Sequence, residues 1–178
     1  MYNVGILTLS DKGSRGERED LSSQVIREIL TEHDYNVSEY KIIPDDYELI
    51  RTELIRMSDE LKLDLILTTG GTGLSMRDVT PEATKSIMTR DVPGISEAMR
   101  SDSLKITRRA MLSRAASVLR DQTLIVNLPG SPKAVRENLN SIIDQLKHGL
   151  DILTGRDGEC AVPDLDHPVK EHHSHHHH

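Results

Sequence analysis

The chain has 178 residues, which suits one domain of ordinary size, and no stretch reaches the roughly 20 apolar residues that a membrane-spanning helix needs. Its formal net charge is −7, from 22 lysines and arginines against 29 aspartates and glutamates, and tyrosine is its only aromatic residue. We therefore expect neither a membrane protein nor a nucleic-acid binder, because the latter needs a basic surface or aromatic side chains that stack on bases. The single cysteine, Cys160, cannot form a disulfide within the chain, and the N-terminus lacks the basic and apolar regions of a signal peptide, so we expect a cytoplasmic protein.

The first part of the chain is predicted to alternate strand and helix. Residues 3–10 are mostly apolar and lead into the polar turn 11–16, which indicates a buried strand followed by a loop. After Asp20, apolar side chains recur at helical spacing. Residues 37–43 predict a second strand, and the turn Pro44-Asp45-Asp46 precedes another helical pattern that reaches Leu61.

The second part continues the same alternation. Residues 63–69 form an apolar, β-branched run that ends at Gly70-Gly71-Thr72-Gly73, which predicts a third strand followed by a glycine loop. Thr80 is predicted as the N-cap of a helix that reaches about residue 88, and residues 95–104 as a further helix. Residues 123–128 predict a strand, and apolar residues from 135 to 153 mark a long closing helix.

This alternation predicts the α/β fold class: a three-layer sandwich with a mostly parallel central sheet and helices on both faces. We expect one domain over residues 1–155. Residues 156–178 form a polar tail whose histidine-rich end is either an expression tag or a native metal-binding tract. In open parallel sheets ligands bind outside the carboxyl ends of the strands, so the functional residues are expected in the strand-to-helix loops.

The glycine loop and the residues that follow it predict an anion site. Glycines after a strand let backbone N–H groups approach a phosphate, and the next helix adds the positive end of its dipole. Arg77 and Asp78 suit a phosphate and the Mg²⁺ that accompanies it. The pattern is neither a P-loop nor GxGxxG, and a tight turn with a surface ion pair or a helix cap is the alternative interpretation.

Other loops offer weaker candidates of the same kind. One of Asp45 and Asp46 is expected to cap the following helix, while the other is free to position Mg²⁺. The loop that begins at Asn127 and the first loop, with Ser10 and Asp11, could hold phosphate or be ordinary turns, and Arg114 could be an anion clamp or a surface charge. Nucleophilic catalysis has little support because no GxSxG motif is present and the sequence around the histidines, His33 and His148 among them, shows no catalytic motif.

The sequence resembles the MogA and MoaB family of molybdenum cofactor biosynthesis proteins, which includes the G domain of gephyrin. Five motifs carry the resemblance in the same order, SDKGSRGERED, IIPDD, TTGGTGLSMRDVTPEAT, MLSR and NLPGSPKAV, and they span roughly the first 155 residues. The first and last of them look most like the MogA branch. The resemblance implies a molybdopterin adenylyltransferase, in which MgATP and molybdopterin give adenylylated molybdopterin and pyrophosphate.

The resemblance also implies roles for individual residues. Asp45 and Asp78 match the family's functional aspartates, for which we expect catalytic positioning of Mg²⁺ and phosphate. Ser113 and Arg114 match a region that we assign to the pterin phosphate. The remaining positions match loops expected to hold ATP and molybdopterin: Ser10, Asp11, Gly70, Gly71, Thr72, Gly73, Asn127, Pro129, Gly130 and Ser131. A homotrimer and a hand-off to a separate MoeA-like metal-insertion protein are implied as well. A non-catalytic carrier of molybdopterin, or a MoaB-like relative, is the alternative.

Overall fold

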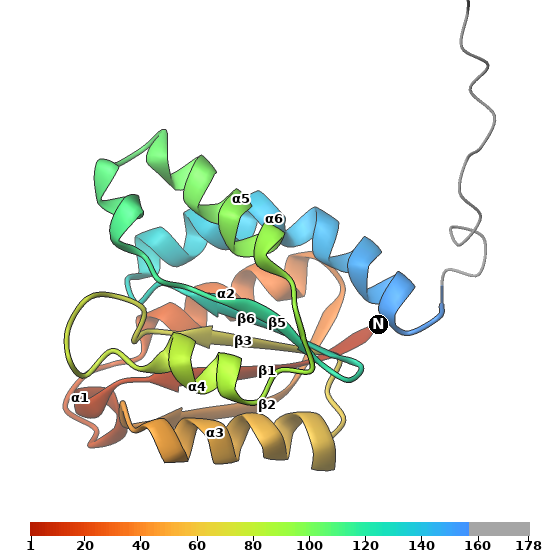
Figure 1. Cartoon of the computed structure of the whole chain (residues 1–178), viewed down its shortest axis with the longest axis horizontal. Coiled ribbons are helices and arrows are strands. Elements are labelled where there is room, and N and C mark those ends of the chain that lie inside the picture. The colour runs from red at the N-terminus through yellow and green to blue at the C-terminus, as the bar shows by residue number, and fades with distance from the viewer. Residues whose placement is uncertain (157–178) are drawn as a thin grey trace, which may run out of the picture.

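A computed structural model of the chain describes residues 1–156. They form three layers, with one sheet between two layers of helices (Figure 1). The six strands lie in the order β2-β1-β3-β6-β5-β4. Four of them are parallel, and they are β1 (Tyr2–Leu9), β2 (Tyr35–Ile43), β3 (Leu65–Thr69) and β6 (Thr123–Leu128). Antiparallel pairing adds β5 (Ser117–Arg120) and the short edge strand β4 (Arg90–Asp91). The α/β fold and its mostly parallel sheet are confirmed.

Helices cover both faces of the sheet (Figure 1). One face carries α2 (Leu21–Glu32), α5 (Pro93–Leu104) and α6 (Pro132–Leu153), and the other carries α3 (Tyr47–Ile55) and α4 (Thr80–Ser86). A π-helical turn, η1 (Arg56–Glu60), extends α3, and two short pieces complete the structure: α1 (Asp11–Ser14) and the 3₁₀ helix η2 (Arg108–Leu112). Within residues 1–156, no helix has the length and apolar character that crossing a membrane requires.

The inner parallel strands β1, β3 and β6 are largely apolar because both of their faces are buried, whereas the edge strand β2 is only partly buried. Side chains alternate between faces along each strand, so Ile6 joins the core under α2 and α6 whereas Leu7 joins the core under α3 and α4. Leu67 and Ile66 of β3 divide between the two cores in the same way. The central strands are thereby fixed in register, and the loops that follow them are presented at one edge of the sheet.

Two local predictions are wrong. Strand and helix do not alternate throughout, because β5 and β6 form a hairpin whose turn contains Asp121 with a left-handed φ of 49°, and a hairpin needs no crossover helix. Thr80 is not an N-cap: it lies inside α4, is fully buried, and its hydroxyl donates to the Gly70 carbonyl at 3.0 Å. The division at residue 155 stays a prediction, and residues 157–178, with Cys160 and the histidine-rich end, lie outside the described residues.

Candidate functional site

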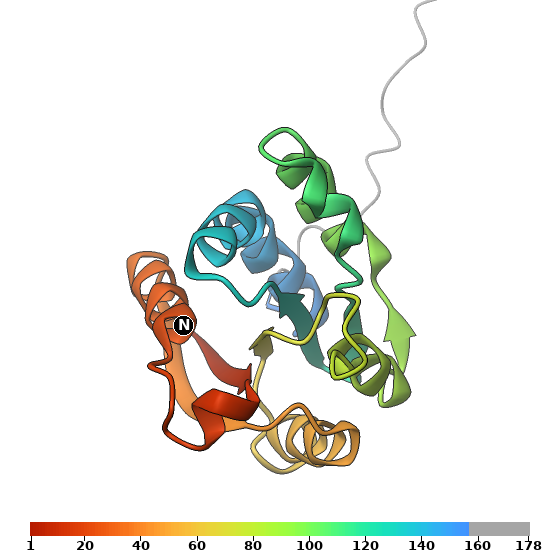
Figure 2. The same ribbon diagram turned by 90° about the vertical axis from the view of Figure 1, so that its left-hand side faces the viewer.

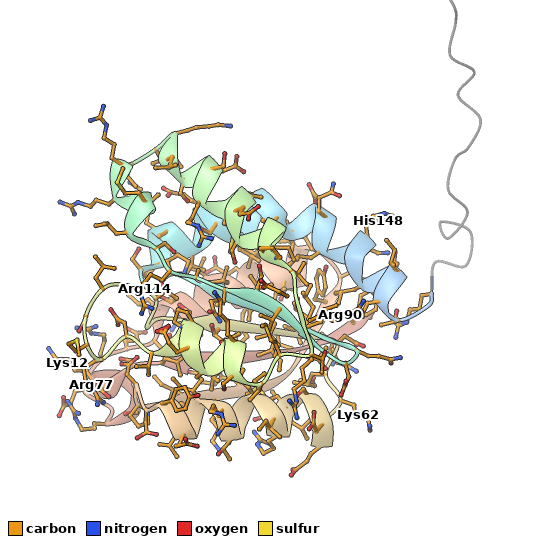
Figure 3. All side chains as sticks on the ribbon, in the orientation of Figure 1. Lys12, Lys62, Arg77, Arg90, Arg114 and His148 are labelled. Carbon is orange, nitrogen blue, oxygen red and sulfur yellow. The ribbon has the colours of Figure 1, made fainter. Side chains whose placement is uncertain are left out.

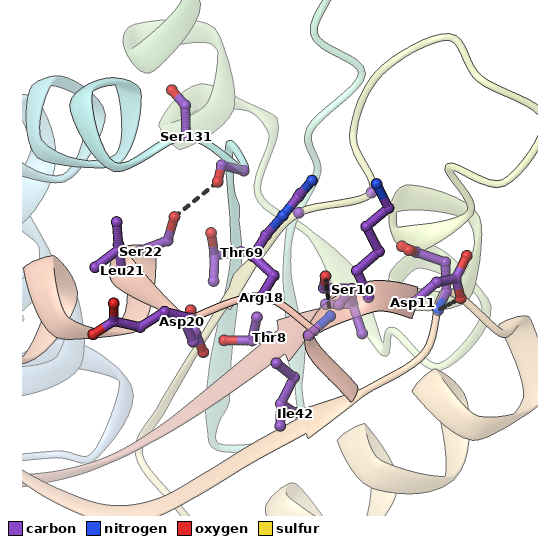
Figure 4. Close-up of a pocket in the computed structure, with 18 of the residues that line it drawn as sticks. Thr8, Ser10, Asp11, Arg18, Asp20, Leu21, Ser22, Ile42, Thr69 and Ser131 are labelled. Atoms are coloured by element: carbon purple, nitrogen blue, oxygen red, sulfur yellow. Dashed lines mark hydrogen bonds between the residues drawn. The ribbon is translucent and has the colours of Figure 1, made fainter. Parts of the chain in front are cut away.

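The loops that follow β1, β2, β3 and β6 meet at the carboxyl edge of the parallel strands, the end of the molecule that faces the viewer in Figure 2. They enclose an open cavity of about 820 Å³. Figure 4 shows its lining, which includes Ser10, Asp11, Asp45, Gly70, Gly71, Gly130 and Ser131 from the predicted set. The volume suits a cofactor-sized ligand. The sheet therefore brings together loops that are distant in the sequence.

The glycine loop begins with two positions, Gly70 and Gly71, that no other residue would occupy without strain or overlap. Gly70 and Gly71 have φ values of 99° and 70°, in the left-handed region. A side chain on Gly70 would overlap the Leu9 carbonyl, and one on Gly71 would overlap the Thr80 hydroxyl and lie 3.0 Å from Asp45 Oδ1. The close approach of Asp45 to this backbone thus depends on glycine at position 71.

The two aspartates after β2 divide their roles, as expected. Asp46 is the N-cap of α3, because its carboxylate accepts from the Leu49 N–H at 3.0 Å. Asp45 Oδ1 is buried and has no hydrogen-bond partner among the described residues. Burial raises the pKa of the Asp45 carboxyl above its usual range, and the nearby charges of Asp11 and Asp78 raise it further. Asp45 is therefore an unsatisfied carboxylate at the cavity wall, which is the arrangement that a cation would relieve.

Asp11 links the first loop to the glycine loop. Its carboxylate accepts two hydrogen bonds from the Arg77 guanidinium, at 2.8 and 3.1 Å, and one from the Asp45 N–H at 3.0 Å. The hydrogen bonds from Arg77 hold the pKa of the Asp11 carboxyl below its usual range. Ser10 caps α1 by accepting from the Gly13 N–H at 2.9 Å. The Arg77 guanidinium, although exposed, is therefore paired with the Asp11 carboxylate.

Asp78 lies in the glycine loop and does not itself line the cavity, although its charge is close enough to Asp45 to raise the pKa of that carboxyl. Its Oδ2 accepts from the Ser75 N–H at 3.1 Å and would lie 2.9 Å from a Cβ on Gly73, so the carboxylate is packed against the loop's own backbone. Within residues 1–156, no group of three or more His, Cys, Asp or Glu is arranged to hold a metal ion alone. Asp45 and Asp78 fit Mg²⁺ if substrate oxygens complete its coordination, because Mg²⁺ binds to one or two carboxylates plus phosphates.

The loop after β6 forms the opposite wall. The Pro129 carbonyl accepts from the Thr69 hydroxyl at 2.6 Å. The Gly130 carbonyl accepts from the Ser22 hydroxyl at 2.7 Å (Figure 4). Ser131 caps the 22-residue helix α6 by accepting from the Ala134 N–H at 3.2 Å, and Ser131 and Pro132 place the positive end of this helix at the cavity edge. This wall therefore offers the positive end of a helix dipole to a phosphate.

Two residues of the predicted set are turned away from the cavity. Asn127 is fully buried: its amide donates at 3.0 Å to the hydroxyls of Thr68 and Thr84, and its Oδ1 accepts from the Ala116 N–H at 3.1 Å. The structure therefore gives Asn127 an internal role. Arg114 also binds protein atoms, and its guanidinium donates to the carbonyls of Gly73 and Asp78.

Ser113 lies elsewhere. It lines a separate hollow of about 190 Å³ between α5, η2 and α6, which Pro129 also lines. Thr72 is buried, and its carbonyl accepts from the Arg114 N–H at 2.9 Å. Thr72 and Gly73 therefore belong to the loop that borders the main cavity rather than to its lining.

Sequence reasoning missed Arg18, which lies across the cavity in Figure 4. It has no hydrogen bond or ion pair with any described residue, in contrast to Arg77. The signal was present, since Arg18 belongs to the SDKGSRGERED motif, but its spacing alone does not show which side of the loop it occupies. Figure 3 places Lys12 and Arg77 at this end of the molecule and His148 at the other.

Comparisons with known proteins agree on one family. Residues 5–148 match the family model described as "Probable molybdopterin binding domain". The molybdopterin adenylyltransferase of Helicobacter pylori strain J99 is 44% identical over 155 residues, which cover 86% of this chain and 88% of that protein. The molybdopterin adenylyltransferase of Escherichia coli K12 is 41% identical over 79% of this chain and 73% of its own length. The crystal structure of the molybdopterin biosynthesis enzyme MoaB from Thermus thermophilus superimposes with a TM-score of 0.83, at 49% identity, over 87% of this chain and 98% of that chain.

Proposed function

The chain belongs to the family of molybdopterin-binding domains that includes the MogA and MoaB proteins, and we propose that it works as a molybdopterin adenylyltransferase. It transfers AMP from ATP to the terminal phosphate of molybdopterin. A bond forms between an oxygen of that phosphate and the α-phosphorus of ATP, and the bond from the α-phosphorus to the bridging β-oxygen breaks, which releases pyrophosphate. The observation that carries the proposal is the unpartnered Asp45 oxygen against the glycine loop, at the wall of a cavity large enough for a nucleotide.

The reaction requires the two reacting phosphates to be positioned and their charge neutralised more than it requires proton transfer. The attacking phosphate is already anionic, so the step requires no general base and no Ser-His-Asp constellation. The glycine loop brings its backbone close to one side of the cavity, and the N-terminus of α6 brings the positive end of its dipole to another. We assign Gly70, Gly71, Gly130 and Ser131 to binding the phosphates, with Thr72 and Gly73 as the border of the same loop.

The charge of the cavity favours a divalent cation with the substrates. The lining has four carboxylates, on Asp11, Glu19, Asp20 and Asp45, against the cations Lys12 and Arg18. Two polyanionic substrates would be repelled by this surface without a counterion. Asp45 and Asp78 would hold Mg²⁺, which neutralises phosphate charge when bound. Asp11 orients Arg77 and fixes the backbone of Asp45 through its hydrogen bonds.

Assembly and hand-off are proposed on the family resemblance. A homotrimer would have a candidate contact in the exposed apolar side chains at the end of α5 and on η2, namely Leu104, Ile106, Met111 and Leu112. The adenylylated product is a natural substrate for a separate MoeA-like protein that inserts the metal. A cytoplasmic location stays a prediction of the sequence.

One assay separates an enzyme from a carrier. Purified protein is incubated with molybdopterin, ATP and Mg²⁺, with adenylylated pterin measured by chromatography and pyrophosphate measured in parallel. We expect both products, and neither after removal of Mg²⁺. Bound pterin without pyrophosphate would instead identify a carrier.

Asp78→Asn provides the matched variant for this assay. Asparagine retains an oxygen that can accept from the Ser75 N–H, so the loop should keep its shape while losing a charge. We expect turnover to be abolished and pterin binding to persist. Loss of both would make Asp78 a structural residue.

A further inference from the structure

Arg114 connects the two ends of segment 72–78, the part of the glycine loop that follows Gly71. Its backbone N–H donates to the Thr72 carbonyl at 2.9 Å, and its Nε donates to the Gly73 carbonyl at 2.8 Å. Its Nη2 donates to the Asp78 carbonyl at 2.7 Å. Thr72 and Gly73 begin the segment 72–78 of this loop and Asp78 ends it, so one residue, 36 positions farther along the chain than Asp78, connects the two ends of the segment.

The third nitrogen of the guanidinium anchors this connection to a helix. Arg114 Nη1 lies 2.7 Å from each carboxylate oxygen of Glu82, in the first turn of α4. The two side chains are 36% and 46% exposed, so the ion pair adds little stability by Coulomb attraction alone. The ion pair instead fixes the orientation of the guanidinium, because each of its three nitrogens donates to a protein acceptor.

Apolar packing does not hold the segment between these anchors. Leu74 and Met76, its two large apolar side chains, are 64% and 95% exposed. The contacts that restrain it are polar: Arg77 with Asp11, Asp78 with the Ser75 N–H, and the hydrogen bonds of Arg114. Because an exposed loop without apolar anchors opens easily, removal of Arg114 should release the segment that contains Asp78.

We propose that Arg114, together with Glu82, is a positioning residue that holds loop 72–78 so that the Asp78 carboxylate meets the substrate phosphates and their Mg²⁺, and that Arg114 does not itself bind molybdopterin. The role of Asp78 in this inference rests on the proposed function. The hold of Arg114 on the loop rests on the hydrogen bonds alone.

Hydrogen–deuterium exchange tests the hold without any assay of activity. In Arg114→Ala, amides of residues 72–78 should exchange about tenfold faster than in the parent protein, because two carbonyls lose their donors. Arg114→Lys should give an intermediate rate, since one ammonium cannot replace a planar fork with three acceptors. Unchanged exchange in Arg114→Ala would overturn the proposal.

Arg120→Ala is the matched control. Arg120 also binds one carboxylate and one carbonyl, with Nε and Nη2 on Asp59 at 3.0 and 2.8 Å and Nη1 on the Ile87 carbonyl at 2.7 Å, and it does not line the cavity. We expect exchange in residues 72–78 to be unchanged in this variant. Equal acceleration in Arg120→Ala would show a general loss of stability and would refute a specific hold.

Kinetics then separate positioning from substrate contact. Arg114→Ala should lower kcat by about 10- to 100-fold and raise the Mg²⁺ concentration for half-maximal turnover, while KM for molybdopterin changes less than about twofold. Glu82→Gln should shift both parameters in the same direction by less. A rise in KM for molybdopterin with an unchanged Mg²⁺ response would identify Arg114 as a ligand contact. If the parent protein shows no turnover, the proposed function fails, and the exchange experiment still tests the hold on the loop.

Discussion

Gly71→Ala tests whether the contact of the glycine loop with Asp45 and Thr80 is as tight as the structure shows. Gly71 has a φ of 70°, and an alanine in the left-handed region costs about 1–2 kcal/mol. The new methyl group would also overlap the Thr80 hydroxyl, which is fully buried and donates to the Gly70 carbonyl. Displacing that hydroxyl leaves a buried polar pair unsatisfied, at about 1–3 kcal/mol. We expect a total loss of about 2–5 kcal/mol in the free energy of unfolding.

Gly16→Ala separates the two contributions. Gly16 has a φ of 75°, and nothing lies within 4 Å of the position that its Cβ would take. It should therefore lose only the conformational part, about 1–2 kcal/mol. Urea denaturation of both variants, followed by circular dichroism, measures the difference, with the slope of each transition checked for constancy.

Equal losses in Gly71→Ala and Gly16→Ala would refute the reasoning, because the Thr80 contact would then add nothing. A second check uses the double variant Gly71→Ala/Thr80→Ala. Since Thr80→Ala removes the hydroxyl that the new methyl group meets, the combined loss should be smaller than the sum of the single losses. Strict additivity would show that the two positions do not touch.

Three further predictions address the site. Folding raises the pKa of the Asp45 carboxyl above 3.8, so the folded protein binds this proton more tightly than the unfolded chain does. The free energy of unfolding should therefore fall as the pH rises from 3.8 through the pKa of Asp45 in the folded protein. Asp45→Asn should abolish turnover and also remove this fall in stability. Urea titrations at pH 7 should therefore find the variant more stable than the parent protein, and a less stable variant would contradict the account. Arg18→Gln should raise KM for ATP about tenfold at low salt and less at high salt, whereas Arg90→Gln, on the distant edge strand, should leave it unchanged. Asn127→Ala should cost about 2–4 kcal/mol by urea denaturation, because it leaves three buried partners unpaired, and a loss below about 1 kcal/mol would mean that they find other partners.

The sequence determined the features that depend on neighbours along the chain. Apolar runs predicted β1, β3 and β6, because a strand buried on both faces is largely apolar, and the edge strand β2 was predicted although it is only partly buried. The Pro44-Asp45-Asp46 turn predicted that one aspartate caps a helix, and Asp46 does so. The glycine pattern predicted a loop at the end of β3, and Gly70 and Gly71 have the positive φ values that such a loop requires.

Tertiary structure alone decided which distant residues meet. Arg77 reaches Asp11 across 66 positions, and Arg114 reaches Glu82 across 32. Whether Asn127 faces a ligand or the core depends on the neighbours that sheet order gives to β6, and those neighbours are set by pairing between strands far apart in the sequence. Periodicity and motif spacing describe only local geometry, so they located the loops of the site but left undetermined which of their side chains face the cavity and which hold the loops in place.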